Sequence, residues 1–281
     1  MGWLIFVILY LFFYVIFNQT YKMATKSLTK PGALTILLQL ISSLSILLLI
    51  PFFEMKMPND PKIYLFLGLS IIFYTISDRV NTTVRSGIEA STFSVITQLS
   101  TVFMIVAGVL FFKEPFVLNK FIGAILIVFS NVLIFFKKGN GKPNKYVLLG
   151  IFANVCFSIA LFLDVNNSDK FNLPIYVAST LGIPTILIAI FEKIKFSDIK
   201  EEYKNGNKKA ILITAITWSL SIVAQLRAYQ LGEVSIVAPL CALSVILNVI
   251  VGYFFLKEKD DMLKKIIAAL LIILGIILIK V

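Results

Sequence analysis

Long apolar stretches follow one another along the whole chain, and they constrain its fold more than any other feature. A helix that crosses a bilayer core of about 30 Å needs about 20 mostly apolar residues. The stretches are each long enough to cross, and the connections between them are too short for a separate soluble domain. We therefore predict an all-α, polytopic membrane protein with about ten transmembrane helices, over residues 3–21, 32–53, 63–83, 91–112, 116–136, 146–165, 173–191, 209–229, 234–256 and 263–280.

Composition and charge agree with a lipid environment. Hydrophobic residues make up 59% of the chain and charged residues 15%, against about 45–50% and about 25% in soluble domains. The net charge of +11 comes from lysines between the apolar stretches, where they would meet lipid headgroups. We expect localisation in the cell membrane, membrane lipid and a small-molecule substrate as partners, and no nucleic acid; a homodimer is left open.

Metal and cofactor chemistry has little support in the sequence. There is no histidine, and Cys156 and Cys241 lie inside apolar stretches, as small core residues do. Residues 1–17 are apolar but are followed by Asn18 and Gln19 rather than by a cleavage site, so we interpret them as the first span. We predict no cofactor and no metal.

An internal repeat is the strongest signal. When the sequence is shifted by 144 residues, residues 87–137 align without gaps onto 231–281. Identical pairs include Glu89/Glu233, Gly108/Gly252, Lys113/Lys257, Glu114/Glu258 and Lys120/Lys264. Apolar bias does not explain charged residues and glycines that recur in register. We predict a first five-helix repeat over 1–138, a linker over 139–145 and a second repeat over 146–281.

The number of spans in each half has a topological consequence. With five spans a half, the second half must enter the membrane from the opposite side. Two inverted repeats are the design of many secondary transporters, whose substrate site lies at the repeat interface. The sequence thus predicts transport by alternating access.

Both halves share a junction motif that is similar to one in a known family. The junction runs from Gly108 to Glu114 and again from Gly252 to Glu258, each ending in Lys-Glu. A stretch from Arg227 to Ser235 precedes the second copy. The whole chain resembles the EamA family of the drug/metabolite transporter superfamily. The resemblance implies transport of amino acids or other small metabolites; a flippase for a lipid-linked metabolite, which the same superfamily includes, is the alternative.

Ionisable residues inside spans are expensive and often functional. Asp78 and Arg79 lie in the third span, and Asp164 lies in the sixth. Arg79 could meet a carboxylate-bearing substrate, and Asp78 or Asp164 could couple transport to a cation; alternatively, Asp78 and Arg79 reach the headgroups from a span end.

Polar and aromatic residues in the spans complete the candidate site. Trp218 and Gln225 share a helix face at i and i+7, and Asn154 and Ser158 share one at i and i+4. Each could bind substrate, or could instead anchor the span or join neighbouring helices. The substrate-binding candidates are Asn18, Tyr74, Arg79, Gln98, Asn154, Ser158, Trp218, Gln225 and Asn248.

The junction residues have a different predicted role. Gly108 and Gly252 would allow close helix approach, and Glu114 and Glu258 would fasten the turn into the next helix. These four are interpreted as structural.

Enzymatic activity inside the membrane is a competing function. An intramembrane transferase would need clustered acids for Mg²⁺, but the pairs Asp260-Asp261 and Glu201-Glu202 lie among lysines in short loops. We therefore predict that the chain is not an enzyme.

The orientation in the membrane can be predicted in two ways, and they disagree. Most of the 26 Lys and Arg fall in the loops opposite the N-terminus, which places both termini outside by the positive-inside rule. The family resemblance implies both termini in the cytoplasm.

Overall fold

The computed structural model describes residues 2–111, 118–119, 122–123, 125–126, 129–130, 144–258 and 262–280. The described part is helical and contains no strand. The first half contains α1 (Gly2–Ala24), α2 (Pro31–Ile46), α3 (Pro61–Gly87), α4 (Ala90–Ile96) and α5 (Leu99–Leu110). The second half contains α7 (Lys145–Asn167), α8 (Leu173–Phe191), α9 (Phe196–Asn205), α10 (Lys208–Leu231), α11 (Val234–Ala242), α12 (Ser244–Val251) and α13 (Met262–Lys280).

The prediction of a polytopic helical protein is confirmed. Eight segments of the described part are long and apolar enough to cross a membrane. More than half of the predicted span over 116–136 lies outside the described residues, and α13 occupies the predicted tenth span. The count of about ten therefore stays a prediction.

Two predicted spans are broken helices. Residues 91–112 form α4 and α5, which separate at Thr97 and Gln98, and residues 234–256 form α11, α12 and a π-helical turn over Gly252–Leu256. The two breaks lie at nearly equivalent positions of the repeat. Apolar content alone could not reveal them, because each break lies within one continuous apolar segment.

Local signals fix where the helices begin. The side chains of Asp60, Asn144, Asn172 and Asn207 accept backbone N–H bonds at the starts of α3, α7, α8 and α10. An oxygen at this position satisfies an N–H that has no partner within the helix. Pro31 begins α2, where a missing N–H costs nothing.

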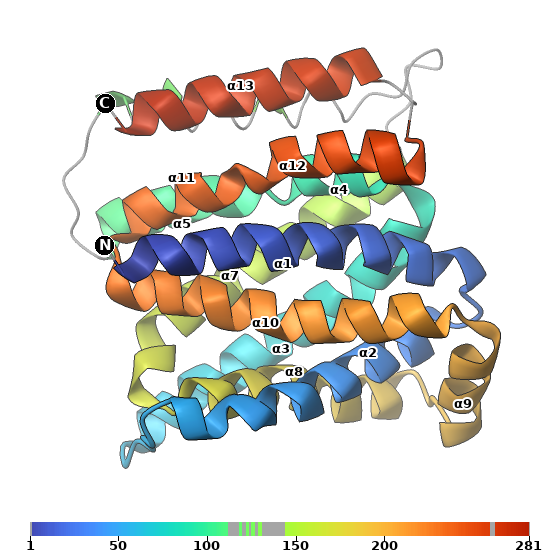
Figure 1. Cartoon of the computed structure of the whole chain (residues 1–281). Coiled ribbons are helices and arrows are strands. Elements are labelled where there is room, and N and C mark those ends of the chain that lie inside the picture. Colours follow the sequence, from blue (N-terminus) through green and yellow to red (C-terminus); the bar gives the residue numbers. More distant parts are fainter. Residues whose placement is uncertain are drawn as a thin grey trace.

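Helices of the two halves pack as repeat-related pairs. In Figure 1, α1 lies beside α10 and α2 lies near α8, and α3 packs against α7. The shift of 144 residues converts the pair α1 and α10 into the pair α7 and α3. The repeat seen in the sequence is therefore also present in the way the helices pack.

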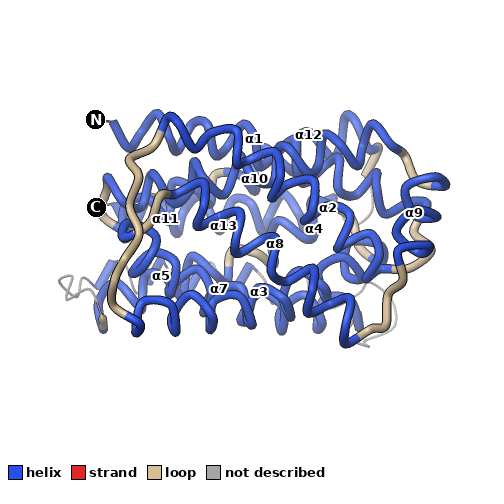
Figure 2. The backbone as a smooth tube through the Cα atoms, turned by 90° about the horizontal axis from the view of Figure 1, so that it is seen from below, coloured by secondary structure: helices blue, strands red, loops and turns tan. Residues whose placement is uncertain are grey.

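The short helix α9 lies at one end of the bundle (Figure 2). The carboxylate of Glu202 accepts bonds from the backbone N–H groups of Thr29 and Lys30, each at 3.1 Å, just before α2 begins. Lys30 Nζ donates to Asp198 Oδ1 at 2.7 Å, and this bond holds the pKa of the Asp198 carboxyl below its usual range. These contacts fasten α9 to the start of α2.

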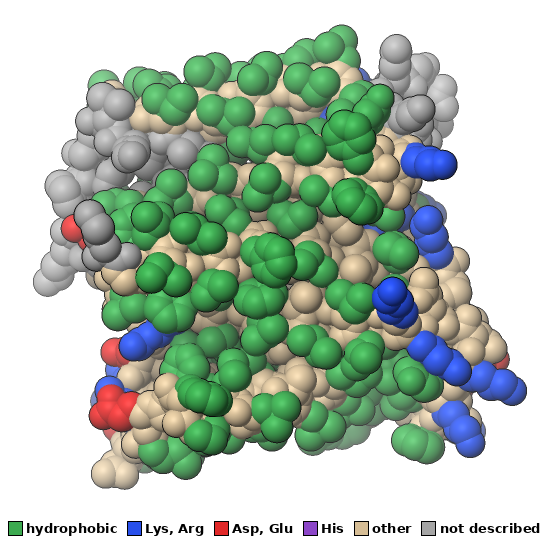
Figure 3. All heavy atoms as spheres, in the orientation of Figure 1, with side chains coloured by type: hydrophobic (Ala, Val, Ile, Leu, Met, Phe, Trp, Pro, Cys, Tyr) green, Lys and Arg blue, Asp and Glu red, His purple; other side chains and the backbone are tan. Residues whose placement is uncertain are grey.

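The outer surface suits lipid. Figure 3 shows hydrophobic side chains over most of one face of the helical bundle. Leu48, Phe191 and Phe255 are among the large apolar side chains that are mostly exposed. Such a continuous apolar surface is unfavourable in water, and in a membrane protein it faces the acyl chains.

Candidate functional site

A cavity lies among α1, α3, α4, α5, α7, α10 and α11. Its atom-free space of about 930 Å³ includes open solvent. Its lining is rich in aromatic side chains and contains several polar ones. The lining residues are Tyr10, Tyr14, Phe17, Tyr21, Tyr74, Asp78, Asn81, Arg85, Phe93, Thr97, Gln98, Ser100, Thr101, Asn154, Phe157, Leu161, Trp218, Ser221, Ile222, Gln225, Leu226, Tyr229, Ala238, Cys241 and Ala242.

The two halves contribute equivalent positions to this cavity. On α3 the lining residues recur at i, i+4, i+7 and i+11, so they form one helix face; α10 presents the same face. Under the shift of 144 residues the matching lining pairs are Tyr10/Asn154, Phe17/Leu161, Tyr74/Trp218, Asp78/Ile222, Asn81/Gln225, Arg85/Tyr229, Thr97/Cys241 and Gln98/Ala242. The cavity therefore lies at the interface between the repeats.

Six predicted site residues line the cavity: Tyr74, Asp78, Gln98, Asn154, Trp218 and Gln225. The Trp218 ring stacks on Phe17 with 5.5 Å between ring centroids, and it lies 5.9 Å from Tyr21. Gln98 lies at the break between α4 and α5, where its side chain donates to Ser94 O at 2.9 Å. Their common location supports the interpretation that they face a solute.

The two candidate coupling carboxylates differ in position. Asp78 lines the cavity, and its Oδ2 accepts a bond from Gln39 Nε2 at 2.9 Å. Asp164 is fully buried and accepts bonds from the hydroxyls of Tyr74 at 2.8 Å and Tyr176 at 2.7 Å. Asp164 thus lies behind the lining residue Tyr74 and holds it in place.

Arg79 lies away from the cavity. Its Nε forms an ion pair with Glu192 at the end of α8, and its Nη1 donates to Thr83 Oγ1 at 2.8 Å. Adjacent helix residues point about 100° apart, so the face that brings Asp78 to the cavity turns Arg79 outward. The expectation that Arg79 meets substrate finds no support in this placement.

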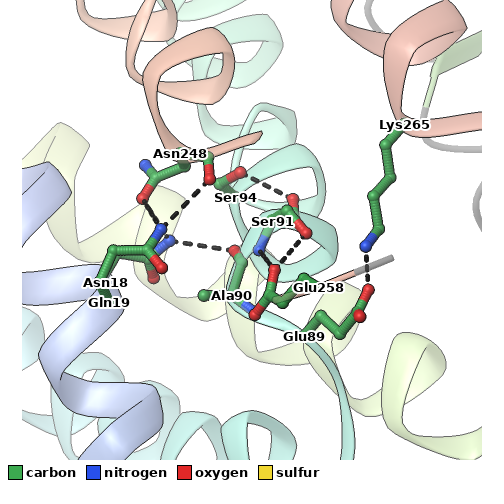
Figure 4. A network of polar contacts seen from close by, with 9 residues as sticks. All are labelled: Asn18, Gln19, Glu89, Ala90, Ser91, Ser94, Asn248, Glu258 and Lys265. Atoms are coloured by element: carbon green, nitrogen blue, oxygen red, sulfur yellow. Dashed lines mark hydrogen bonds and ion pairs between the residues drawn. The ribbon is translucent and has the colours of Figure 1, made fainter. Parts of the chain in front are cut away.

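Three other candidates take part in helix contacts around the cavity. Asn18 is fully buried, and its Nδ2 donates to Asn248 Oδ1 at 2.9 Å and to Ala90 O at 3.0 Å. Gln19 Nε2 also donates to Asn248 Oδ1, at 3.0 Å (Figure 4). Ser158 donates to Asn154 O at 2.7 Å, a bond within α7. The bonds of Asn18 and Gln19 to Asn248 fit the alternative interpretation, in which the buried amides join neighbouring helices.

The second junction fastens the two halves together. Figure 4 shows Glu258 directed at the start of α4, where its carboxylate accepts bonds from Ala90 N at 2.7 Å and Ser91 N at 3.0 Å. A Cβ on Gly252 would come within 2.8 Å of Glu258 Oε2, so the glycine makes room for the carboxylate. Gly108 is buried in α5, and Glu114 lies outside the described residues.

Sequence reasoning missed Arg85, which lines the cavity. The predicted third span stopped at residue 83, but α3 continues to Gly87. This extension keeps Arg85 on the same helix face as Tyr74 and Asp78. The spacing of Tyr74, Asp78 and Arg85 on one helix face could have identified Arg85. It was overlooked because the predicted span, which was based on hydropathy, ended before residue 85.

Metal ligation finds no basis in the described part of the chain. No group of three or more His, Cys, Asp and Glu residues there could hold an ion. The lining offers aromatic faces, amides, hydroxyls, one carboxylate and one guanidinium. That chemistry suits the reversible binding of a small polar molecule.

The helical bundle, its apolar exterior and its cavity define a polytopic membrane protein. The EamA-like transporter family matches the chain twice, along residues 1–136 and 144–281, and the chain belongs to this family. A solved structure titled "Crystal structure of protein" is similar, with a TM-score of 0.60 and 14% identity over 97% of this chain and 95% of that one. No curated protein sequence matches significantly.

Family membership has consequences for function. EamA-like proteins are membrane transporters of small solutes, so a non-enzymatic role is plausible for this chain. The similar structure shares too little sequence to indicate more than the fold. The linker predicted over 139–145 stays a prediction, since most of it lies outside the described residues.

Proposed function

We propose that this protein is a secondary transporter that moves a small metabolite, an amino acid or a related solute, by alternating access. The observation that carries the proposal is the cavity to which both repeats contribute equivalent positions. Secondary transporters with repeated halves bind substrate at the repeat interface, where helices are often discontinuous. The breaks between α4 and α5 and between α11 and α12 lie beside this cavity.

The directions of equivalent helices support an inverted repeat. Lys22, near the end of α1, donates to Arg85 O near the end of α3 at 2.7 Å. Tyr146, at the start of α7, lies against Gly87 at the same end of α3. The end of α1 and the start of α7 therefore share one end of the bundle, so these equivalent helices run in opposite directions.

Polar contacts join helices on the side of the bundle that holds α9. Asn18 and Gln19 bond to Asn248 across the two halves. Tyr21 and Thr82 share a hydroxyl bond of 2.6 Å, and Thr82 shares another of 2.6 Å with Thr35. Alternating access would open this layer while the opposite end closes. Because histidine is absent, a carboxylate would have to carry a coupling proton. Asp78 is the coupling candidate that lines the cavity.

The test is flux of labelled metabolites into proteoliposomes, with and without an imposed proton gradient. We expect saturable flux that Gln225→Ala reduces strongly, because Gln225 lines the cavity. Arg79→Ala is the matched control and should retain flux, because Arg79 pairs with Glu192 outside the cavity. Both variants must elute as folded protein. Absence of flux for every solute, combined with scrambling of a fluorescent lipid, would instead support the flippase alternative.

A further inference from the structure

Arg85 is a buried cation whose charge has no acidic partner in the described part of the chain. The side chain is 3% exposed and lines the cavity. Its Nη1 donates to Asn18 Oδ1, whereas its Nε has no hydrogen-bond partner there. No ion pair joins Arg85 to a carboxylate among the described residues. Buried charges are normally paired, because removing them from water is costly.

Aromatic rings surround the guanidinium group. Its central carbon lies 3.8 Å from the centroid of the Phe93 ring, 4.6 Å from that of Tyr21 and 5.0 Å from that of Phe17. Ring faces attract a cation and hold the guanidinium plane in position. They do not neutralise its charge, so the site remains electropositive.

The carboxylate of the lining attracts the guanidinium electrostatically but forms no ion pair with it. Asp78 is the acidic residue of the lining, and it lies seven residues before Arg85. That spacing is a rise of about 10 Å on an α-helix. The Asp78 carboxylate is already engaged with Gln39. The Lys22 ammonium and the hydroxyls of Tyr14 and Tyr21 are the other titratable groups that interact with the guanidinium, and none of them supplies a negative charge at neutral pH.

We propose that Arg85 binds the carboxylate of a small organic anion, and that the aromatic lining of the cavity receives the apolar body of this anion. The proposal relies on the proposed function only for the location of the solute site. A planar guanidinium pairs with a carboxylate through two parallel bonds. No lysine lines the described cavity, so a single positive charge favours a carboxylate over the more highly charged phosphate.

A purely structural role for Arg85 is the competing explanation. In that case the guanidinium would simply join Asn18 of α1 to the rings of α1 and α4. The two roles differ in one respect: a structural arginine does not discriminate between a charged solute and its neutral isostere.

The experiment measures binding rather than transport. The chain has two tryptophans, and Trp218 lines the cavity, so Trp3→Phe leaves Trp218 as the fluorescent reporter. Purified protein is titrated with pairs of aliphatic and aromatic carboxylates and their primary amides, and with phosphate esters of similar size. We expect the carboxylate of at least one pair to bind about tenfold to a hundredfold more tightly than its amide. In Arg85→Gln this preference should fall to about twofold or less, while amide affinity changes little.

Each outcome decides between the explanations. Equal binding of carboxylates and amides by the Trp3→Phe protein would overturn the proposal, whether or not the Arg85→Gln variant folds. A preference that persists in folded Arg85→Gln would overturn the role of Arg85, and preference for phosphate esters would overturn the assignment of a carboxylate. Arg85→Lys should keep part of the preference, because it retains the charge. Arg85-dependent carboxylate binding without flux in proteoliposomes would contradict the transport proposal but not this one.

Discussion

At the residue scale, position on a helix face decides what a charged side chain does. Arg79 and Arg85 both belong to α3, yet Arg79 pairs with Glu192 while Arg85 lies buried against the cavity. Asp78 faces the cavity, whereas Asp164 is held by two tyrosine hydroxyls behind it. Similar residue types thus take different roles because the helix directs them differently.

Asp78 and Asp164 should therefore respond differently to neutralisation. We expect Asp78→Asn to abolish uphill accumulation driven by a proton gradient while downhill flux persists, because an amide cannot carry the proton. Asp164→Asn should mainly lower thermal stability, by roughly 1–3 kcal/mol, because it disturbs buried bonds to Tyr74 and Tyr176. The measurements are flux with and without the gradient, and thermal unfolding in detergent. Gradient-driven accumulation by Asp78→Asn would exclude this carboxylate as the coupling group.

Gly252 offers a second test at the residue scale. Its φ of −59° is helical, so alanine fits the backbone, but the added Cβ would lie 2.8 Å from Glu258 Oε2. We expect Gly252→Ala to lower the free energy of unfolding by about 1–2 kcal/mol, because the carboxylate must leave the start of α4. Gly68→Ala in α3 is the control, since a Cβ there meets nothing within 4 Å. Equal stability of the two variants would show that the carboxylate is not held tightly.

At the scale of elements, residues of the second half hold an element of the first half in place. The start of α4 belongs to the first repeat, but its N–H groups bond to Glu258 of the second. Lys265 of α13 forms an ion pair with Glu89 beside the same helix start (Figure 4). The short half-helix α4 is therefore stabilised largely from outside its own repeat.

Removal of the Glu258 carboxylate should weaken this connection. We expect Glu258→Ala to destabilise the protein by about 1–3 kcal/mol, because the N–H groups of Ala90 and Ser91 lose their buried partner. Glu192→Ala removes a partly exposed ion pair instead and should cost about 1 kcal/mol or less. Thermal unfolding of both variants in one detergent provides the comparison. A smaller loss for Glu258→Ala than for Glu192→Ala would contradict the assigned role.

At the scale of the whole molecule, the exposed lysines of the described residues are distributed unevenly between the two ends. The end that holds α9 carries the exposed residues Lys26, Lys30, Lys193, Lys195, Lys200, Lys204, Lys208 and Lys209. Figure 3 shows this accumulation of basic side chains at one end of the bundle. The opposite end carries Lys56, Lys62 and Lys170. Basic loops favour the cytoplasmic side.

The orientation can be measured with single cysteines. In a background without Cys156 and Cys241, Lys204→Cys reports on α9 and Glu54→Cys reports on the opposite end; both positions are exposed. We expect an impermeant maleimide on intact cells to label position 54 and spare position 204, which would place the start of α1 outside. Permeabilised cells should label both. The reverse pattern would show that the orientation implied by the family resemblance holds despite the distribution of lysines.

Features that can be read locally along the chain were sufficient to predict the class of protein and the repeat. Apolar stretches of bilayer length require transmembrane helices, and identical residues at a shift of 144 require two related halves. The predicted spans also identified Tyr74, Asp78 and Trp218 as site candidates, because polar, ionisable and amphipathic aromatic residues inside a span often face a cavity or a partner rather than lipid.

Which of the candidates share the cavity depends on contacts that form only in the folded protein. Hydropathy averages over a window, so it neither detects the breaks within two spans nor shows how far α3 extends as a helix. Hydropathy therefore left Arg85 outside the predicted third span, and it gave no reason to exclude Arg79 from the substrate-binding candidates. The cavity exists because faces from both repeats meet across the interface, and such contacts between distant segments are absent from any local pattern of residues.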